Sequence, residues 1–126
     1  MLLDTHIFLW WLFDDPKLSK AMRSIISDSA NIFFVSSACV WEITTKYRIG
    51  RLPEAQSVAN DVPYWINKAG FNPLAISPEH AQLAGSWKID HRDPFDRMLA
   101  AQAKIEDLSL ISIDKALSDF PIKIIN

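Results

Sequence analysis

The sequence predicts a three-layer α/β fold, in which helices cover both faces of a central, mostly parallel sheet of about five strands. Segments with the pattern of strands alternate with helical segments along the whole chain, which is typical of parallel sheets. The run IFFV at 32–35 is apolar at every position, as expected of a strand buried on both faces. The chain has 126 residues, 49% of them hydrophobic, without repeats or a flexible linker. We therefore expect one domain over residues 1–126.

The first quarter of the chain predicts two strands and two helices. Residues 1–4 form a short apolar strand that ends in an acid, and residues 5–13 follow as a helix or helical turn that the run DDP ends. Leu, Met and Ile recur at helical spacing through residues 18–29, which predicts a second helix. The apolar run at 32–35 is the second strand.

Two further helices are expected in the middle of the chain. Ser36 or Ser37 caps a helix that continues to a stop at Gly50, since small hydroxyl residues begin helices and glycine ends them. Another helix is expected near residues 55–69, with Pro63 close to a break or a fresh start.

The second half contains two helices that begin with the same signal, a capping residue followed by proline. Ser77-Pro78 begins one helix and Asp93-Pro94 begins another, over 95–105, because proline fits the first helical turn. The remaining predicted elements are the strands 71–76, 108–113 and 122–125 and one turn of helix at 115–119.

Composition and charge exclude several classes of protein. The net charge of −2 argues against a generally basic coat for nucleic acid, although it leaves room for a local basic patch. The single cysteine, Cys39, precludes an internal disulfide and fits the reducing cytoplasm, where we expect the protein. The N-terminal segment MLLDTHIFLWWLF carries Asp4 and His6 and lacks a basic leader, so we expect neither a signal peptide nor a membrane-spanning helix.

Four acidic residues stand out by their positions. Asp4 ends the first predicted strand and Asp114 follows the strand that contains LISI, so both belong at the carboxyl edge of the sheet. Glu42 is the one charged residue between positions 31 and 45, on an otherwise apolar helix, where a buried carboxylate needs a partner. Asp96 lies in the first turn of the helix 95–105, which is rich in small and apolar residues.

Each of these acids also has a purely structural interpretation. Asp4 and Asp93 are suited to cap the helices that follow them, and Asp114 to form a turn. Asp96, three residues after Asp93, is placed to complete a capping box. Together, however, carboxylates on one edge repel each other unless a cation neutralises them. Oxygen ligands without a His or Cys cluster suit Mg²⁺ or Mn²⁺, ions that serve phosphoryl chemistry.

Three segments of the chain resemble those of a known family. They are LLDTHIFLWWL at the start, SSACVWEITTKYRIGRL in the middle, and HRDPFDRMLAAQA followed by LISID near the end. In these segments the chain resembles the PIN-domain ribonucleases, in particular the VapC-type toxins of bacterial and archaeal toxin–antitoxin pairs. The resemblance implies a PIN-like fold and an endoribonuclease that acts as the toxin of such a pair. It also implies hydrolysis of RNA phosphodiester bonds with a metal-activated water.

The resemblance assigns roles to the acidic residues. It implies that a catalytic quartet holds Mg²⁺ or Mn²⁺, and that this quartet consists of Asp4, Glu42, Asp96 and Asp114. Ser112, close before the fourth acid, and Thr5 are expected to support the site. Asp93 belongs to the segment DPFDRMLAAQA, which resembles one branch of these toxins, but not to the quartet, so we expect it to cap its helix, with a secondary role at the site.

Basic residues near these acids are candidates for RNA contacts. Lys46, Arg48 and Arg51 lie at the end of the helix that carries the second acid. Arg92 and Arg97 flank the third acid. An ordinary alternative exists for all five, since cations favour a helix C-terminus, most charge runs are solvated, and arginines pair with neighbouring acids.

The aromatic segment WWLF at 10–13 and the histidines are also open to two interpretations. Core packing accounts for some of these side chains, but a helix that is apolar on nearly every side is also suited to be covered by a partner. The resemblance implies a homodimer and a cognate antitoxin laid along a hydrophobic groove. His6 is expected either to position a ligand or to hold the turn after Asp4, whereas His80 and His91 are expected to be structural.

Three functions follow from these patterns. The first is the metal-dependent endoribonuclease, with tRNA, rRNA or mRNA as its substrate. The alternative is a non-cleaving PIN-like module that binds RNA or a partner, which predicts that substitution of the four acids is tolerated. A third, another metal-dependent phosphotransfer enzyme such as a phosphatase, is disfavoured because it requires an Asp-x-Asp pattern, whereas the chain reads Asp4-Thr5-His6.

Overall fold

The computed structural model describes all residues from 1 to 126 and contains one five-stranded sheet. The strands are β1 (Leu2–Leu3), β2 (Phe34–Ser36), β3 (Asn72–Leu74), β4 (Leu110–Ile111) and β5 (Ile124–Ile125). Their order across the sheet is β3-β2-β1-β4-β5, and every neighbouring pair is parallel. The predicted α/β class is confirmed, and the sheet is wholly rather than mostly parallel.

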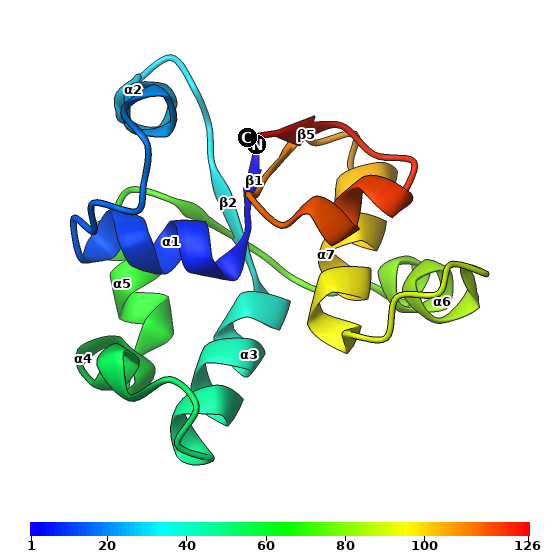
Figure 1. The fold of residues 1–126 in the computed structure, drawn as a ribbon, viewed down its shortest axis with the longest axis horizontal. Helices are drawn as coiled ribbons and strands as arrows, with labels where there is room; N and C mark the ends of the chain where they lie inside the picture. Colours follow the sequence, from blue (N-terminus) through cyan, green and yellow to red (C-terminus); the bar gives the residue numbers. More distant parts are fainter.

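Helices lie on both sides of this sheet, which confirms the three-layer arrangement. The helical elements are α1 (Thr5–Leu12), α2 (Lys20–Ser27), α3 (Ser37–Arg48), η1 (Pro53–Ala55), α4 (Gln56–Ala59), α5 (Val62–Lys68), α6 (Pro78–Ser86), α7 (Pro94–Ile105) and η2 (Lys115–Asp119). Figure 1 shows α1, α2 and α5 on one side of the strands and α6 and α7 on the other. None of the helices combines the length and the apolar character that crossing a bilayer demands.

The strands are shorter than the apolar runs that predicted them. Backbone pairing nevertheless continues beyond the assigned ends, since Asp4 N–H donates to the Ile111 carbonyl at 3.0 Å and Ser112 N–H to the Ile125 carbonyl at 3.1 Å. At the other edge, β3 pairs with β2 alone, and this edge position tolerates Pro73, which has no N–H to donate. The parts of the apolar runs outside these ladders lie in the loops that flank the strands.

Two of the predicted helices have different bounds in the structure. The helix expected near 55–69 is split into η1, α4 and α5, because Asp61 caps a new helix and Pro63 lies in its first turn. Pro63 thus marks the fresh start that was one of its two predicted roles. The helix expected over 18–29 begins only at Lys20, since Ser19 is its cap, and Leu18 is buried ahead of it.

The start and stop predicted for the helix after β2 are confirmed. Ser36 caps α3 by accepting a hydrogen bond from Ala38 N–H at 2.9 Å. The helix ends ahead of Gly50, whose φ of +79° is a left-handed conformation that favours glycine. This cap places Glu42 on the second turn of α3, close to the sheet.

The strand order determines where a site can form. From β1 the chain proceeds outward through β2 to β3, and then returns to β4 on the opposite side of β1. In open parallel sheets, ligands bind beyond the carboxyl ends of the strands at such a reversal. Leu2, Leu3, Leu110 and Ile111 are fully buried and anchor the two central strands. The residues that follow β1 and β4 are therefore held side by side.

Candidate active site

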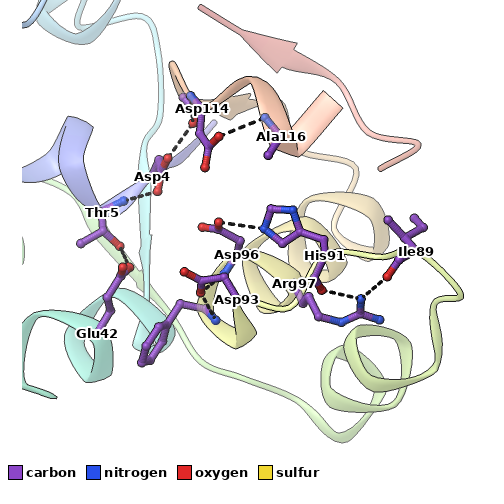
Figure 2. Close-up of polar contacts among 12 residues, drawn as sticks. Asp4, Thr5, Glu42, Ile89, His91, Asp93, Asp96, Arg97, Asp114 and Ala116 are labelled. Atoms are coloured by element: carbon purple, nitrogen blue, oxygen red, sulfur yellow. Dashed lines mark hydrogen bonds and ion pairs between the residues drawn. The ribbon is translucent and has the colours of Figure 1, made fainter. Parts of the chain in front are cut away.

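The four acids predicted to form a site line one cavity of about 330 Å³ at this edge of the sheet. Figure 2 shows Asp4, Asp96 and Asp114 pointing toward one another. The lining residues are Asp4, His6, Ile7, Trp10, Glu42, Lys46, Asp93, Asp96, Ile113 and Asp114. The cavity therefore gathers five carboxylates, from the end of β1, from α3, from the start of α7 and from the segment after β4.

Asp4 is both a helix cap and part of this cavity. It is only 7% exposed, its Oδ1 accepts Thr5 N–H at 2.7 Å, and its Oδ2 accepts the Ser112 hydroxyl at 2.6 Å. Burial raises the pKa of Asp4, and the nearby charge of Glu42 adds to this effect, whereas the two hydrogen bonds oppose it. The carboxyl group of Asp4 consequently favours its neutral form more than an exposed aspartate does.

Ser112 joins the acids at the ends of the two central strands. Besides donating to Asp4, its hydroxyl accepts Asp114 N–H at 3.0 Å. Asp114 in turn accepts Ala116 N–H at 3.0 Å, which caps η2 and confirms the predicted turn. The side chain of Asp114 is exposed, so it is the most accessible carboxylate of the quartet.

Glu42 is buried on α3 and has two partners. Thr5 donates its hydroxyl hydrogen to Glu42 Oε1 at 2.5 Å, and the Lys46 ammonium group forms an ion pair with Glu42 Oε2. Burial by itself lowers the pKa of Lys46, but the bond to Glu42 and the charges of Asp93 and Asp96 raise it above its ordinary value. The buried acid thus has the partner that its position required, and the cavity contains a charged ammonium group.

Asp93 and Asp96 have different partners at the start of α7. Asp93 caps the helix by accepting two N–H groups of the first turn at 2.9 and 3.2 Å, as predicted, and it also lines the cavity. Asp96 does not complete a capping box, because its Oδ2 accepts a hydrogen bond from His91 Nε2 at 3.0 Å. Burial raises the pKa of Asp96 to about 7, and the charge of Asp93 adds to this shift, while the bond to His91 opposes it.

The chemical composition of this cavity fits a divalent cation. The donor set is entirely oxygen, as Mg²⁺ and Mn²⁺ prefer, and the raised pKa values of Asp4 and Asp96 reflect burial with insufficient compensating charge. No three His, Cys, Asp or Glu side chains lie close enough together to hold a metal ion. The carboxylates are instead turned toward the hydroxyl, ammonium and imidazole groups described above. A bound cation would compete with those groups for the same oxygens.

The basic residues predicted to contact RNA occupy three kinds of position. Lys46 lines the cavity. Arg48, Arg51 and Arg92 are exposed outside it, so a contact with RNA stays a prediction for them. The prediction that Arg97 contacts RNA is wrong, because its guanidinium group donates to four backbone carbonyls and is not free to meet a substrate. Those acceptors are the carbonyls of Ala84, Trp87, Ile89 and His91, at 2.6 to 2.9 Å.

The roles of His91 and Trp10 at the site were missed in the sequence, whereas His6 had ligand positioning as one of its two expected roles. His91, expected to be structural, bonds directly to Asp96. The signal available was its place two residues before the cap of α7. His6 and Trp10 both line the cavity with ring centroids 6.1 Å apart, and their spacing of four residues on α1 already predicts a shared face. His80, by contrast, is buried and structural, as expected.

Comparison with known proteins relates the chain to one family. The PIN domain family model matches residues 1–123. A segment of 58 residues is 36% identical to Ribonuclease VapC16 of Mycobacterium tuberculosis (strain ATCC 25618 / H37Rv), and it covers 46% of this chain and 41% of that protein. The match thus spans less than half the length of that relative.

Solved structures with low sequence identity share the fold. VapBC2 from Rickettsia felis, crystallised bound to a DNA fragment from their promoter, superposes with a TM-score of 0.70 and 15% identity, over 99% of this chain and 96% of that one. FitAcB from Neisseria gonorrhoeae superposes with a TM-score of 0.66 and 16% identity, over the same shares of the two chains. At such identities the likeness concerns the fold.

Proposed function

Because the chain belongs to the PIN domain family, we propose that it is a Mg²⁺- or Mn²⁺-dependent endoribonuclease that hydrolyses RNA phosphodiester bonds. The observation that supports this function most is the cavity lined by five carboxylates and one ammonium group at the carboxyl edge of the sheet. The partial similarity to Ribonuclease VapC16 supports RNA as the substrate.

In this proposal the acidic quartet holds the ion, and the surrounding residues orient the quartet. Asp4, Glu42, Asp96 and Asp114 would hold the ion, which would lower the pKa of a bound water and offer positive charge to the phosphate oxygens. The hydroxyl groups of Thr5 and Ser112 fix one oxygen each of Glu42 and Asp4. The other oxygens, Asp4 Oδ1 and Glu42 Oε2, are bound to Thr5 N–H and the Lys46 ammonium group, so an ion would share or displace these contacts.

Lys46 and Asp96 have further roles. The Lys46 ammonium group lies in the cavity beside Glu42 and favours an anionic phosphate there. In the ion-free protein, the pKa of Asp96 is about 7, so this carboxyl group exchanges a proton near neutral pH.

The test is cleavage of a total RNA pool by purified protein, freed of any bound partner, with Mg²⁺ or Mn²⁺. Discrete fragments are expected, and sequencing their ends would identify the target among tRNA, rRNA and mRNA. EDTA and the substitution Asp4→Asn should both abolish the fragments, while Asp119→Asn, at an exposed acid on η2, should cleave like the wild type. Cleavage that persists in EDTA or in Asp4→Asn would reject the proposal.

One observation favours the alternative of a non-cleaving binding module. The Lys46 ammonium group already compensates Glu42, and no three potential ligands converge on one point. A module of this kind would bind RNA or a partner in EDTA, would cleave nothing, and would tolerate Asp4→Asn. The cleavage experiment therefore separates the two functions directly.

We also place the protein as the toxin of a toxin–antitoxin pair, acting as a homodimer in the cytoplasm. The support is the resemblance to VapC-type toxins and the fold shared with VapBC2 and FitAcB. Phe13, at the end of α1, is 36% exposed, and Trp10 and Trp11 are only partly buried, which leaves apolar surface for an antitoxin segment. Light scattering tests the dimer, and co-purification with the protein encoded beside it tests the antitoxin.

A further inference from the structure

The start of α7 has side chains with hydrogen-bonding oxygens at both positions of a capping box, Asp93 and Asp96, and yet leaves the box open. Asp93 is the cap, and Asp96 stands at the third helical position, where an acid ordinarily accepts the N–H of the capping residue. Asp93 accepts hydrogen bonds from the first turn, but no protein group accepts its own N–H. The Asp96 carboxylate is bound to His91 instead, at 3.0 Å.

The connector between α6 and α7 is built to hold His91 in this place. Figure 2 shows the Arg97 guanidinium group reaching back from α7 to the carbonyls of Ile89 and His91. The same group also donates to the carbonyls of Ala84 and Trp87, so one side chain binds the backbone at four points from the end of α6 to His91. The backbone position of His91 is thereby determined by α7 itself.

The imidazole ring of His91 is also fixed by packing. It packs edge-on against Phe120, with ring centroids 5.4 Å apart, and Phe120 is itself buried and packed against Trp87. The side chains of His91 and Asp96 are only 10% and 13% exposed, respectively. Since water cannot readily replace this contact, the direction of the Asp96 carboxylate depends on the His91 ring.

We infer that His91 is a positioning residue that keeps the Asp96 carboxylate out of the capping box and directed into the acidic cavity. Without a donor at position 91, the carboxylate turns back to Asp93 N–H, which has no acceptor, and closes the box. The consequence for cleavage rests on the nuclease function proposed above, whereas the direction of the carboxylate does not.

Amide hydrogen exchange measured by NMR tests the direction of the carboxylate without any activity. Ser77 N–H, which donates to His80 Nδ1 at 2.9 Å, provides the internal standard for a closed box. In the wild type we expect Asp93 N–H to exchange faster than Ser77 N–H. In His91→Phe, which keeps a ring against Phe120 but has no donor, Asp93 N–H should become protected about as well as Ser77 N–H.

Two further variants keep the test decisive if the larger ring disturbs packing. His91→Ala removes the donor without adding bulk and should also protect Asp93 N–H. His91→Gln retains an N–H donor and should leave Asp93 N–H unprotected, as in the wild type. Loss of packing alone reduces protection, so only closure of the box produces a gain. Unchanged or reduced protection in both donor-free variants, with the fold intact, would overturn the inference.

The functional consequence is measured separately by Mn²⁺ titration calorimetry and steady-state cleavage. Loss of a residue that orients a metal ligand typically weakens metal affinity or activity by roughly 10- to 100-fold. We expect this loss in His91→Phe for Mn²⁺ affinity and kcat, with KM for RNA little changed and partial rescue in His91→Gln. If Asp93 N–H becomes protected in the donor-free variants but the wild type cleaves no RNA, the positioning role is retained and the nuclease function is rejected. Protection with undiminished Mn²⁺ affinity and kcat would reject the catalytic consequence alone.

Discussion

Helices α6 and α7 begin with the same local pattern but make different contacts at their third position. In each, a capping residue and a proline precede a side chain that can accept a hydrogen bond at the third helical position. In α6, His80 accepts Ser77 N–H at 2.9 Å and closes the capping box. In α7, Asp96 stands at the same place relative to Asp93, but it binds His91 and faces the cavity.

The difference separates a residue that stabilises the fold from one that is available for chemistry. His80 is 1% exposed, and both of its ring nitrogens have partners, Ser77 N–H on one side and Glu106 at 2.9 Å on the other. Asp96 lacks the local bond, and burial raises its pKa to about 7, with a further contribution from the charge of Asp93. A helix start that departs from its local rule without a gain in stability is typical of a functional site.

The largest expected effect distinguishes the two third-position residues by activity. Asp96→Asn should lower the cleavage rate by roughly 100-fold or more, because it removes a charge directed at the reacting groups. The variant should not have a lower Tm, since a buried carboxylate is replaced by a neutral amide. Initial rates on one RNA substrate and thermal unfolding in the same buffer measure both effects. Wild-type cleavage by Asp96→Asn would remove Asp96 from the quartet.

The next effect concerns the dependence of stability on pH in EDTA. The pKa of Asp96 in the folded protein, about 7, lies above its unfolded value of about 4, so the folded state binds this proton more tightly. The resulting stability is fully present below pH 4 and is lost as the pH rises through 7. One pKa unit corresponds to about 1.4 kcal/mol, so the loss should amount to a few kcal/mol.

Urea unfolding at pH 5 and pH 8 measures this dependence, and the same curves for Asp96→Asn provide the subtraction for all other groups. The variant should lose less stability than the wild type over this interval. At pH 8, Mg²⁺ should stabilise the wild type more than the variant, because the ion binds the ionised carboxylate of Asp96 and compensates its negative charge. A wild type and a variant with parallel pH profiles would contradict the raised pKa of Asp96.

The third effect tests the closed box of α6. His80→Ala should lower the free energy of unfolding by roughly 2–4 kcal/mol, since it removes the capping contact and leaves a cavity in a buried position. The kcat of the folded variant should equal that of the wild type. Gln82→Ala, at an exposed position of the same helix, is the matched control and should change stability by less than about 0.5 kcal/mol. A large loss of kcat in folded His80→Ala would remove the distinction between the two helices.

The smallest effect tests whether RNA approaches the cavity over the connector before α7 or over the end of α3. Arg92→Ala and Arg51→Ala each remove one exposed cation. If the replaced arginine contacts a phosphate, the slope of the logarithm of the binding constant against the logarithm of the salt concentration should be shallower by about 0.7. Filter binding to single-stranded RNA in EDTA over a range of salt concentrations gives both slopes. Equal slopes in both variants and the wild type would exclude phosphate contacts at either residue.

Much of the fold could be predicted because its signals act within a few residues. The caps at Ser36 and Asp93 and the stop at Gly50 were read correctly, since capping and left-handed glycine are local properties. The split at Asp61 was only partly predicted, because apolar spacing continues across it and only Pro63 signals the fresh start. Arg97 was misjudged because no local signal shows that its guanidinium group binds one carbonyl of α6 and three of the connector.

The sequence by itself determined the alternation of strands and helices and several of the residues that cap them, and it singled out four acids as candidates for a site. Only the tertiary structure decided which groups face each other. Asp4 and Ser112 bond across a separation of 108 residues, and Thr5 and Glu42 across 37, because β1 lies between β2 and β4. Even the nearby partner of Asp96 depends on packing around the connector. Local signals act within one turn of chain, whereas strand order and loop conformation depend on burial summed over the whole molecule.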